Sequence, residues 1–286
     1  MRFEDWHTHN SFCRHAIGSI EDYVEKAIEF DLNVIGISDH FPYDYLVHEI
    51  PSLDQIPYET YAMTLNEVDR YVSGWDRLND RYQGKINIRY AFEVDYFKNQ
   101  DQVLNRYFNK YKEKLDYIYG SVHVLFGKAG IFAFDDARFL NKYKEYEVND
   151  DVYLEFFSTL QDMVKSSTFD LDIVTHLDLP KKFDKKVQNK KLVMNKVIET
   201  LELIKKRNLT VEINTSGLRK ETKEQYPSEE IIRIMYELDI PVLLGSDAHE
   251  PKDIAYKFKE TIELLRKIGY SQLAHYKRRK RSYVDI

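Results

Sequence analysis

The chain has 286 residues, a length that suits one α/β barrel better than a single sandwich or bundle. Its net charge of −6 argues against a general nucleic-acid binder, which usually presents a basic face. The single cysteine, Cys13, excludes an intramolecular disulfide and favours a cytoplasmic protein.

The amino-terminal segment, residues 1–10, carries charges and histidines where a signal peptide needs an apolar core. No apolar run approaches the roughly 20 residues that cross a bilayer. We therefore expect a protein without a membrane segment, acting on a small molecule. The sequence leaves the oligomeric state open.

Short apolar runs alternate along the chain with longer amphipathic runs, as in parallel strands covered by helices. In chain order, the predicted strand and helix pairs are residues 2–6 with 19–30, 34–38 with 59–81, 86–94 with 101–114, 117–122 with 149–165, 171–175 with 189–206, 210–214 with 228–238, and 242–245 with 253–267. Ser19 and Asp22 have the spacing of a capping box at the start of the first helix.

Seven strands that are each followed by a helix predict an α/β fold with a parallel sheet. We expect it to close into a distorted, TIM-like (β/α)7 barrel that forms a single domain over residues 1–286. The segment 132–146 is compatible with loop, helix or both. The basic run 277–281 is expected to be a solvated carboxyl-terminal end.

Histidines fall repeatedly at the predicted carboxyl ends of strands. His7 and His9 follow the first strand, with His15 in the loop beyond it, and further histidines follow the second, fourth, fifth and seventh strands: His40, His123, His176 and His249. Because these strand ends share one face of a parallel barrel, residues distant in sequence become neighbours there. Clustered imidazoles that bind metal are neutral ligands, whereas protonated ones would repel one another.

Carboxylates complete this set. Alternate residues at a strand end point the same way, so His7 and His9 can reach one ion, and Asp247 and His249 repeat that spacing. Glu93, at the end of the third strand, can bridge two ions. Mixed imidazole and carboxylate ligands without a thiolate favour zinc, iron or manganese, and nine ligands suit two or three such ions. Several ions would make hydroxide available at neutral pH and hold oxygens during attack at phosphorus.

The end of the sixth strand differs from the others because it has no ligand candidate. Its run Asn214-Thr215-Ser216-Gly217-Leu218-Arg219 offers hydroxyls, amides and an arginine instead. Such groups suit a phosphate, so the sequence predicts a phosphate contact beside the metal site.

The motifs together resemble the PHP family, named for polymerase and histidinol phosphatase. They occur in the order His7-Thr8-His9, Ser38-Asp39-His40, Gly120-Ser121-Val122-His123, His176-Leu177-Asp178 and Gly245-Ser246-Asp247-Ala248-His249. The likeness extends over residues 5–249. Its details, in segments 14–16, 36–42, 93–96 and 214–219, are most similar to the stand-alone histidinol-phosphate phosphatases.

This resemblance implies a trinuclear metal centre. His7, His9, Glu93 and Asp247 would hold one ion; Glu93, His123 and His176 the second; and His15, His40 and His249 the third. A metal-bridging hydroxide would attack the phosphorus of L-histidinol phosphate and release L-histidinol, a reaction of histidine biosynthesis. We expect Glu93, Asp247 and His249 to be catalytic among these ligands.

Substrate contacts are expected outside the ligand set. Arg219 is the first candidate for a phosphate contact, followed by Arg14, Lys181 and Lys182. Asp95 is expected to meet a cationic part of the substrate, with a solvated loop position as its alternative.

Other readings stay open at this point. The enzyme could hydrolyse another small phosphate ester, such as a nucleotide or sugar phosphate; a DNA exonuclease fits less well with the acidic composition. Alternatively, the chain could be a metal-stabilised PHP module without turnover, although inactive relatives should lose ligands and all nine positions are filled here.

Overall fold

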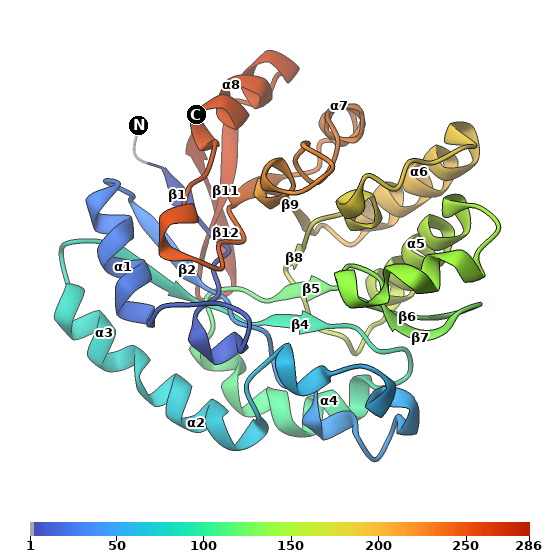
Figure 1. Cartoon of the computed structure of the whole chain (residues 1–286). Helices are drawn as coiled ribbons and strands as arrows, with labels where there is room; N and C mark the ends of the chain where they lie inside the picture. Colours follow the sequence, from blue (N-terminus) through green and yellow to red (C-terminus); the bar gives the residue numbers. More distant parts are fainter. Residues whose placement is uncertain (1–2) are drawn as a thin grey trace.

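Parallel strands form the centre of the molecule, and helices lie outside them (Figure 1). The computed structural model describes residues 3–286, so the first residue of the predicted strand 2–6 lies outside the described part. Within that part, the helices are α1 (Ile20–Glu29), α2 (Leu65–Ser73), α3 (Trp75–Tyr82), α4 (Asp101–Phe108), α5 (Asn149–Lys165), α6 (Lys190–Lys206), α7 (Glu229–Glu237) and α8 (Phe258–Ile268).

Two parallel sheets carry the strands that the sequence predicts. One has the order β1-β2-β3 and the other the order β10-β9-β8-β5-β4. Their bounds are β1 (Glu4–Asp5), β2 (Val34–Ile37), β3 (Asn87–Tyr90), β4 (Glu93–Asp95), β5 (Tyr119–Ser121), β8 (Ile173–Val174), β9 (Thr210–Asn214) and β10 (Val242–Gly245). All residues of β2, β9 and β10 are buried, as expected for strands covered on both faces.

The predicted strand 86–94 is interrupted at Ala91 and Phe92 and changes its partner there. β3 pairs with β2, whereas β4 pairs with β5. At the change, the backbone N–H of Glu93 donates to the carbonyl of Asp39 (3.1 Å), and Glu93 forms an isolated bridge with His40. The interruption thus places Glu93 beside the end of β2.

Hydrogen bonds also connect the first and last strand segments. The N–H of Trp6 donates to the carbonyl of Leu244 (3.1 Å), and the N–H of Asp247 donates to the carbonyl of His7 (2.8 Å). The loops that follow β1 and β10 therefore run side by side.

Several helix boundaries differ from the prediction. The helix expected over 59–81 is two helices, α2 and α3, that meet at Gly74. The last helix begins at Phe258, because Pro251–Asp253 forms a separate 3-10 turn. The capping box of α1 is confirmed, since the backbone N–H of Ser19 donates to Asp22 Oδ2 (2.6 Å) and Ser19 Oγ accepts from the N–H of Asp22 (3.2 Å).

Two antiparallel hairpins are added to the parallel strands: β6 (Val124–Gly127) with β7 (Gly130–Ala133), and β11 (Gln272–Lys277) with β12 (Lys280–Asp285). The segment 132–146 contains the end of β7 and the 3-10 run η6 (Ala137–Glu145). The basic run 277–281 spans the turn of the second hairpin, where Arg279 pairs with Asp170 and Asp172. The prediction of a solvated end therefore holds for Lys277, Arg278 and Lys280, which are exposed, and is wrong for Arg279.

A small aromatic cluster lies between the strands. Trp6, Tyr117 and Tyr119 are buried in it together with Ala274 and Tyr276 of the second hairpin. The ring of Tyr119 stacks on His7 at 4.6 Å between centroids, so this cluster supports the first predicted metal ligand. Among the described residues, none of the helices has both the length and the apolar character that crossing a membrane requires.

Candidate metal centre

Side chains from six chain segments meet at the carboxyl ends of the parallel strands. The structure brings together all nine predicted ligands, namely His7, His9 and His15 after β1, His40 after β2, Glu93 in β4, His123 after β5, His176 after β8, and Asp247 and His249 after β10. Local sequence explains the placement, because each ligand lies at or just beyond a short buried strand whose end faces this side.

The first group of donor atoms contains His7, His9, Glu93 and Asp247. The Nε2 atoms of His7 and His9 are 2.9 Å apart and lie 3.1 and 3.2 Å from Glu93 Oε2. Asp247 Oδ1 is 3.3 Å from His9 Nε2 and 3.9 Å from His7 Nε2. These four atoms therefore surround one small space.

The second group uses the other oxygen of Glu93. Its Oε1 atom lies 3.0 Å from His176 Nε2 and 3.7 Å from His123 Nε2, and the two ring nitrogens are 3.1 Å apart. Since Oε2 faces the first group and Oε1 faces the second, the carboxylate of Glu93 has the geometry of a bridge.

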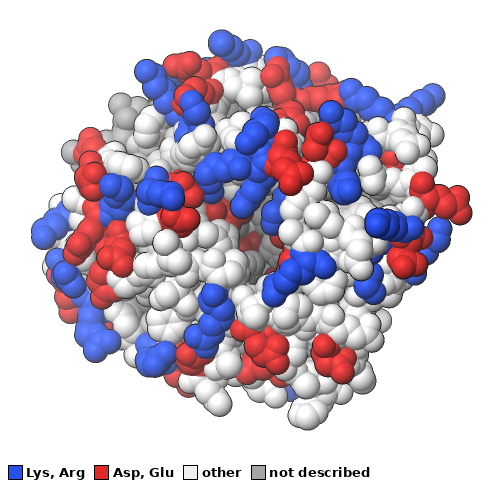
Figure 2. All heavy atoms as spheres, viewed as in Figure 1, with Lys and Arg blue, Asp and Glu red and all other residues white. Residues whose placement is uncertain are grey.

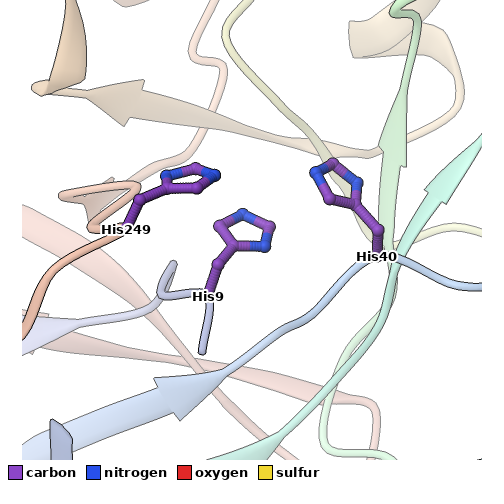
Figure 3. A group of neighbouring side chains, drawn as sticks. All are labelled: His9, His40 and His249. Carbon is purple, nitrogen blue, oxygen red and sulfur yellow. The ribbon is translucent and has the colours of Figure 1, made fainter. Parts of the chain in front are cut away.

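The third group consists of imidazoles. His15 Nε2 lies 2.9 Å from His249 Nε2, and the ring of His9 stacks on both His40 and His249. Figure 3 shows His9, His40 and His249 turned toward one another from three separate segments. His9 thus stands between the first and third groups.

Which nitrogen of each imidazole carries the proton tests whether the residues of the third group fit a metal. His15 Nδ1 donates to the carbonyl of Cys13 (2.6 Å) and His249 Nδ1 donates to the carbonyl of Asp247 (3.1 Å). In the neutral rings, both Nε2 atoms then carry lone pairs, which face each other at 2.9 Å. Lone pairs in this position repel unless a cation lies between them. Zinc coordinated tetrahedrally at about 2.1 Å separates its ligands by about 3.4 Å, and the donor atoms of the first two groups lie between 2.9 and 3.9 Å apart, on either side of that value.

The electrostatics of the cluster also suit a cation. Burial and the charge of His9 lower the pKa of His15 to about 4, and burial lowers the pKa of His40 and His249 well below the ordinary value. These three rings are therefore neutral at physiological pH and available as ligands. Burial opposes ionisation of Glu93, but the charge of His7 and the hydrogen bonds from His176 and His7 hold the pKa of Glu93 well below the usual range.

Two buried carboxylates orient ligand rings from behind. Glu212 Oε1, in β9, lies 2.6 Å from His7 Nδ1, and Asp95 Oδ1 lies 2.9 Å from His123 Nδ1. Such a partner fixes which nitrogen faces the metal and makes the ring a better ligand. Asp95 also accepts the Tyr43 hydroxyl at 2.5 Å, so both of its oxygens have protein partners, and the contact with a cationic part of a substrate stays a prediction.

Sequence reasoning missed Glu212, because it considered strand ends and Glu212 lies inside a strand. A signal was present, since a fully buried position in a parallel strand is unusual for a glutamate and calls for a charged or hydrogen-bonding partner.

A cavity of about 480 Å³ opens over the donor atoms and is lined by His123, His176, Asp247 and His249 among others. Figure 2 shows the same side of the molecule as Figure 1, hollowed near its centre, with acidic atoms in the hollow and basic side chains beside it. The cavity gives a small substrate access to the ligand cluster.

The predicted phosphate contacts are placed differently from one another. Lys182 lines the cavity, where its Nζ lies 2.9 Å from Asp135 Oδ2. Lys181 is bound to Asp178 and Glu224, and Arg14 pairs with Glu67. Lys220, the residue that follows Arg219 in the sequence, also lines the cavity, although it was not predicted from the sequence.

Arg219 is not among the residues that line the cavity. It lies behind the lining and supports the loop that carries Asp247. One nitrogen of its guanidinium donates to the carbonyls of Ser246 (2.9 Å) and Asp247 (3.2 Å). Ser216 and Asn214 donate to Asp247 Oδ2 at 3.1 and 3.3 Å. The segment at the end of β9, the sixth strand predicted from the sequence, therefore holds Asp247 in place. The backbone of Asp247 has a left-handed φ of 50°.

Comparisons with known proteins agree with this geometry. The chain is 27% identical over 265 residues to a "probable histidinol-phosphatase" of Deinococcus radiodurans, covering 93% of both chains. It is 25% identical over 272 residues to the histidinol-phosphatase of Bacillus subtilis, covering 92% of this chain and 99% of the relative.

Solved structures show the same fold. A Listeria monocytogenes protein assigned to the histidinol phosphatases superposes with a TM-score of 0.81 at 26% identity, covering 90% of this chain and 99% of that one. A histidinol phosphate phosphatase of Lactococcus lactis, in complex with zinc, L-histidinol and phosphate, superposes with a TM-score of 0.77 at 18% identity, covering 98% and 99% of the two chains. The model of the PHP domain matches residues 5–216, which include seven of the nine ligands. By this match and the ligand geometry, the chain belongs to the PHP domain family.

Proposed function

We propose that this protein is a metal-dependent phosphomonoesterase that hydrolyses L-histidinol phosphate to L-histidinol and phosphate in histidine biosynthesis. The observation that carries the proposal is the convergence of nine imidazole and carboxylate ligands beneath one cavity. Relatives that match nearly the whole chain are named histidinol-phosphatases, which supports the choice of substrate.

Two or three divalent ions, zinc, iron or manganese, would be held by the three groups of donor atoms described above. Such ions supply hydroxide at neutral pH and neutralise the charge of a phosphoryl group. Among the ligands, we propose Glu93, Asp247 and His249 as the residues that take part directly in the reaction.

The chain itself supplies positive charge for the phosphate. Lys182 and Lys220 line the cavity, and a lysine ammonium acts toward phosphate as a mobile point charge. His15, His40 and His249 are neutral in this structure, so they do not add to that charge. When the substrate expels water from the cavity, the attraction of its phosphate to Lys182 and to Lys220 would become stronger.

We also propose that the two parallel sheets form a distorted (β/α)7 barrel within one PHP-type unit over residues 1–286. The change of partner between β3 and β4 joins the sheets on one side, and the bonds from Trp6 to Leu244 and from Asp247 to His7 join them on the other. The segment beyond residue 216 contributes Asp247 and His249 to the same ligand cluster. A cytoplasmic location remains an expectation from the single cysteine.

The proposal is tested by phosphate release from L-histidinol phosphate, using protein loaded separately with zinc, iron or manganese. We expect turnover that depends on metal and exceeds turnover of an aryl phosphate. Equal rates on both compounds would overturn the substrate assignment, and no turnover on either would overturn the phosphatase assignment. Retention of more than one metal equivalent per chain is the matching expectation for the metal centre.

A further inference from the structure

The imidazole of His9 has a buried sulfur atom behind it. Its Nε2 atom faces the donor atoms of the first group, and its Nδ1 atom lies 3.2 Å from Cys13 Sγ. In the same position His7 and His123 have a carboxylate, whereas the partner of His9 is a thiol. A thiol is a weak hydrogen-bonding group by itself, so the residue beyond it decides how firmly the sulfur is held.

That residue is Asp39, a fully buried carboxylate that follows β2. Cys13 Sγ donates to Asp39 Oδ1 at 2.9 Å, and the same oxygen accepts the backbone N–H of Asn10 at 2.8 Å. Asp39 Oδ2 accepts the side-chain amide of Asn10 and the hydroxyl of Tyr71. These contacts fix the carboxylate, and the carboxylate fixes the direction of the S–H bond.

The positions of the protons follow from this arrangement. Each oxygen of Asp39 accepts an N–H of Asn10, so Asp39 acts as the acceptor and the thiol proton points toward it. The lone pairs of the sulfur then remain for two donors, which are Nδ1–H of His9 and the backbone N–H of His40 at 3.3 Å. A ring that donates from Nδ1 keeps its lone pair on Nε2, which is the nitrogen that faces the metal site.

Cys13 also contacts the third group of donor atoms. Its sulfur accepts the backbone N–H of His40, and its carbonyl accepts Nδ1–H of His15 at 2.6 Å. The rings of His9 and His40 stack with their centroids 4.6 Å apart. One buried residue is therefore joined to three predicted ligands, and its sulfur lies where the first and third groups meet.

We propose that Asp39 and Cys13 form a hydrogen-bond relay that positions the ring of His9 for metal binding. Cys13 is then a positioning residue and neither a ligand nor a nucleophile. This inference rests on the metal centre of the proposed function and extends it to two residues outside the nine ligands. Through the polarised thiol, His9 receives part of the effect that His7 receives directly from Glu212.

The test compares Cys13→Ser with Cys13→Ala in the full chain, with zinc affinity measured by equilibrium dialysis. Serine and alanine have nearly the same volume and differ by one oxygen, so both variants lose the same packing. We expect Cys13→Ala to bind zinc about 10- to 100-fold more weakly, because the ring of His9 loses its partner. Cys13→Ser should recover most of that loss, since a hydroxyl both accepts and donates.

A thiol that only fills space predicts the reverse order of the two variants. A buried hydroxyl then costs free energy that a methyl group does not. Equal zinc affinities of the two variants, or weaker binding by Cys13→Ser, therefore overturn the relay.

Tyr71→Phe is the matched control, because the Tyr71 hydroxyl donates to the other oxygen of Asp39. We expect this variant to have a lower free energy of unfolding and a zinc affinity close to that of the wild type. A loss of zinc affinity as large as that of Cys13→Ala would assign the effect to general disturbance around Asp39 and would overturn the relay.

A measurement on the wild type needs no variant to fold. The donor atoms of His9, Cys13 and Asp39 lie close enough together to hold an ion themselves, and a thiolate would then be a ligand. With Co²⁺ as the bound ion, a thiolate ligand gives an intense sulfur-to-metal absorption band in the near ultraviolet. We expect no such band, because Asp39 holds the thiol proton. Its presence would make Cys13 a ligand and overturn the relay.

The outcomes separate the relay from the proposed function, because zinc affinity and cobalt absorption are measured without substrate. Metal-dependent turnover by the wild type, together with equal zinc affinities of Cys13→Ser and Cys13→Ala, overturns the relay alone. Absence of turnover by the wild type, with the zinc affinities in the expected order, overturns the proposed function and supports the relay.

Discussion

Glu212 Oε1 lies 2.6 Å from His7 Nδ1, and its other oxygen accepts the backbone N–H of His176 at 3.1 Å. One buried carboxylate in β9 therefore positions a ligand of the first donor group and the backbone of a ligand of the second. Its place also requires Gly245 on the neighbouring strand, because a Cβ there would lie 1.9 Å from Glu212 Oε1.

We expect Glu212→Gln to weaken metal binding by about 10- to 100-fold, because the neutral amide no longer polarises the His7 ring. Competition with a coloured chelator measures the affinity. Glu4→Gln is the matched control, since Glu4 contacts the imidazole of His275 at 3.1 Å away from the metal ligands. Equal metal affinity in both variants would contradict the orienting role.

Removal of a shared ligand should remove turnover. His9 stands between two donor groups, and Asp247 closes the first of them. We expect His9→Ala and Asp247→Ala to abolish phosphate release and to lower the metal content found by elemental analysis. His48→Ala, on an exposed segment, should change neither quantity. Near-normal turnover in His9→Ala would refute its assignment as a ligand.

Arg219→Ala should act through the metal centre, because the guanidinium donates to the carbonyls of Ser246 and Asp247. We expect lower metal retention and lower kcat, with a smaller change in KM. Steady-state kinetics at saturating and limiting metal separate the two effects. A raised KM at full metal content would instead support the phosphate contact predicted from the sequence.

Metal binding should release protons at neutral pH. Burial tends to lower the pKa of His7, but the carboxylates of Glu212, Glu93 and Asp247 together raise it well above its ordinary value. The ring is then protonated in the metal-free protein below that raised pKa, and a metal must displace the proton. Affinity should therefore rise with pH through the neutral range.

Titration calorimetry in two buffers of different ionisation enthalpy measures this release. His15, with a pKa of about 4, should contribute no proton above about pH 5. Identical binding enthalpies in the two buffers at pH 7 would show that no proton leaves and would contradict the charge assigned to His7.

Arg279 should matter for stability and not for chemistry. Arg279 lies in the turn of the β11–β12 hairpin, and its side chain, which is 23% exposed, pairs with Asp170 and Asp172. We expect Arg279→Ala to lower the free energy of unfolding by about 1–3 kcal/mol, because two carboxylates lose their partner. Urea unfolding measures the change, and the exposed neighbour Lys280→Ala should have little effect. Equal midpoints for the two variants would contradict the prediction.

Sequence alone was sufficient for the strand ends that carry ligands. The strands ending before His7, His40, His123, His176 and His249 are short buried runs, and parallel strands place their carboxyl ends on one face. The prediction was weaker for helices, since a turn such as Pro251–Asp253 shortens a helix without changing its amphipathic pattern. It was wrong for Arg279 within the basic run 277–281, because the partners of Arg279 lie more than a hundred residues away.

The types, order and spacing of the ligands were thus determined by the sequence itself, because period-two strands and their buried runs are local properties of the chain. Only the tertiary structure decided the partners of those ligands: Glu212 behind His7, Asp95 behind His123, and Arg219 beneath Asp247. The same holds for Lys182 beside Asp135. Each of these contacts joins segments far apart in sequence, and a charged side chain takes whichever partner the fold brings near it.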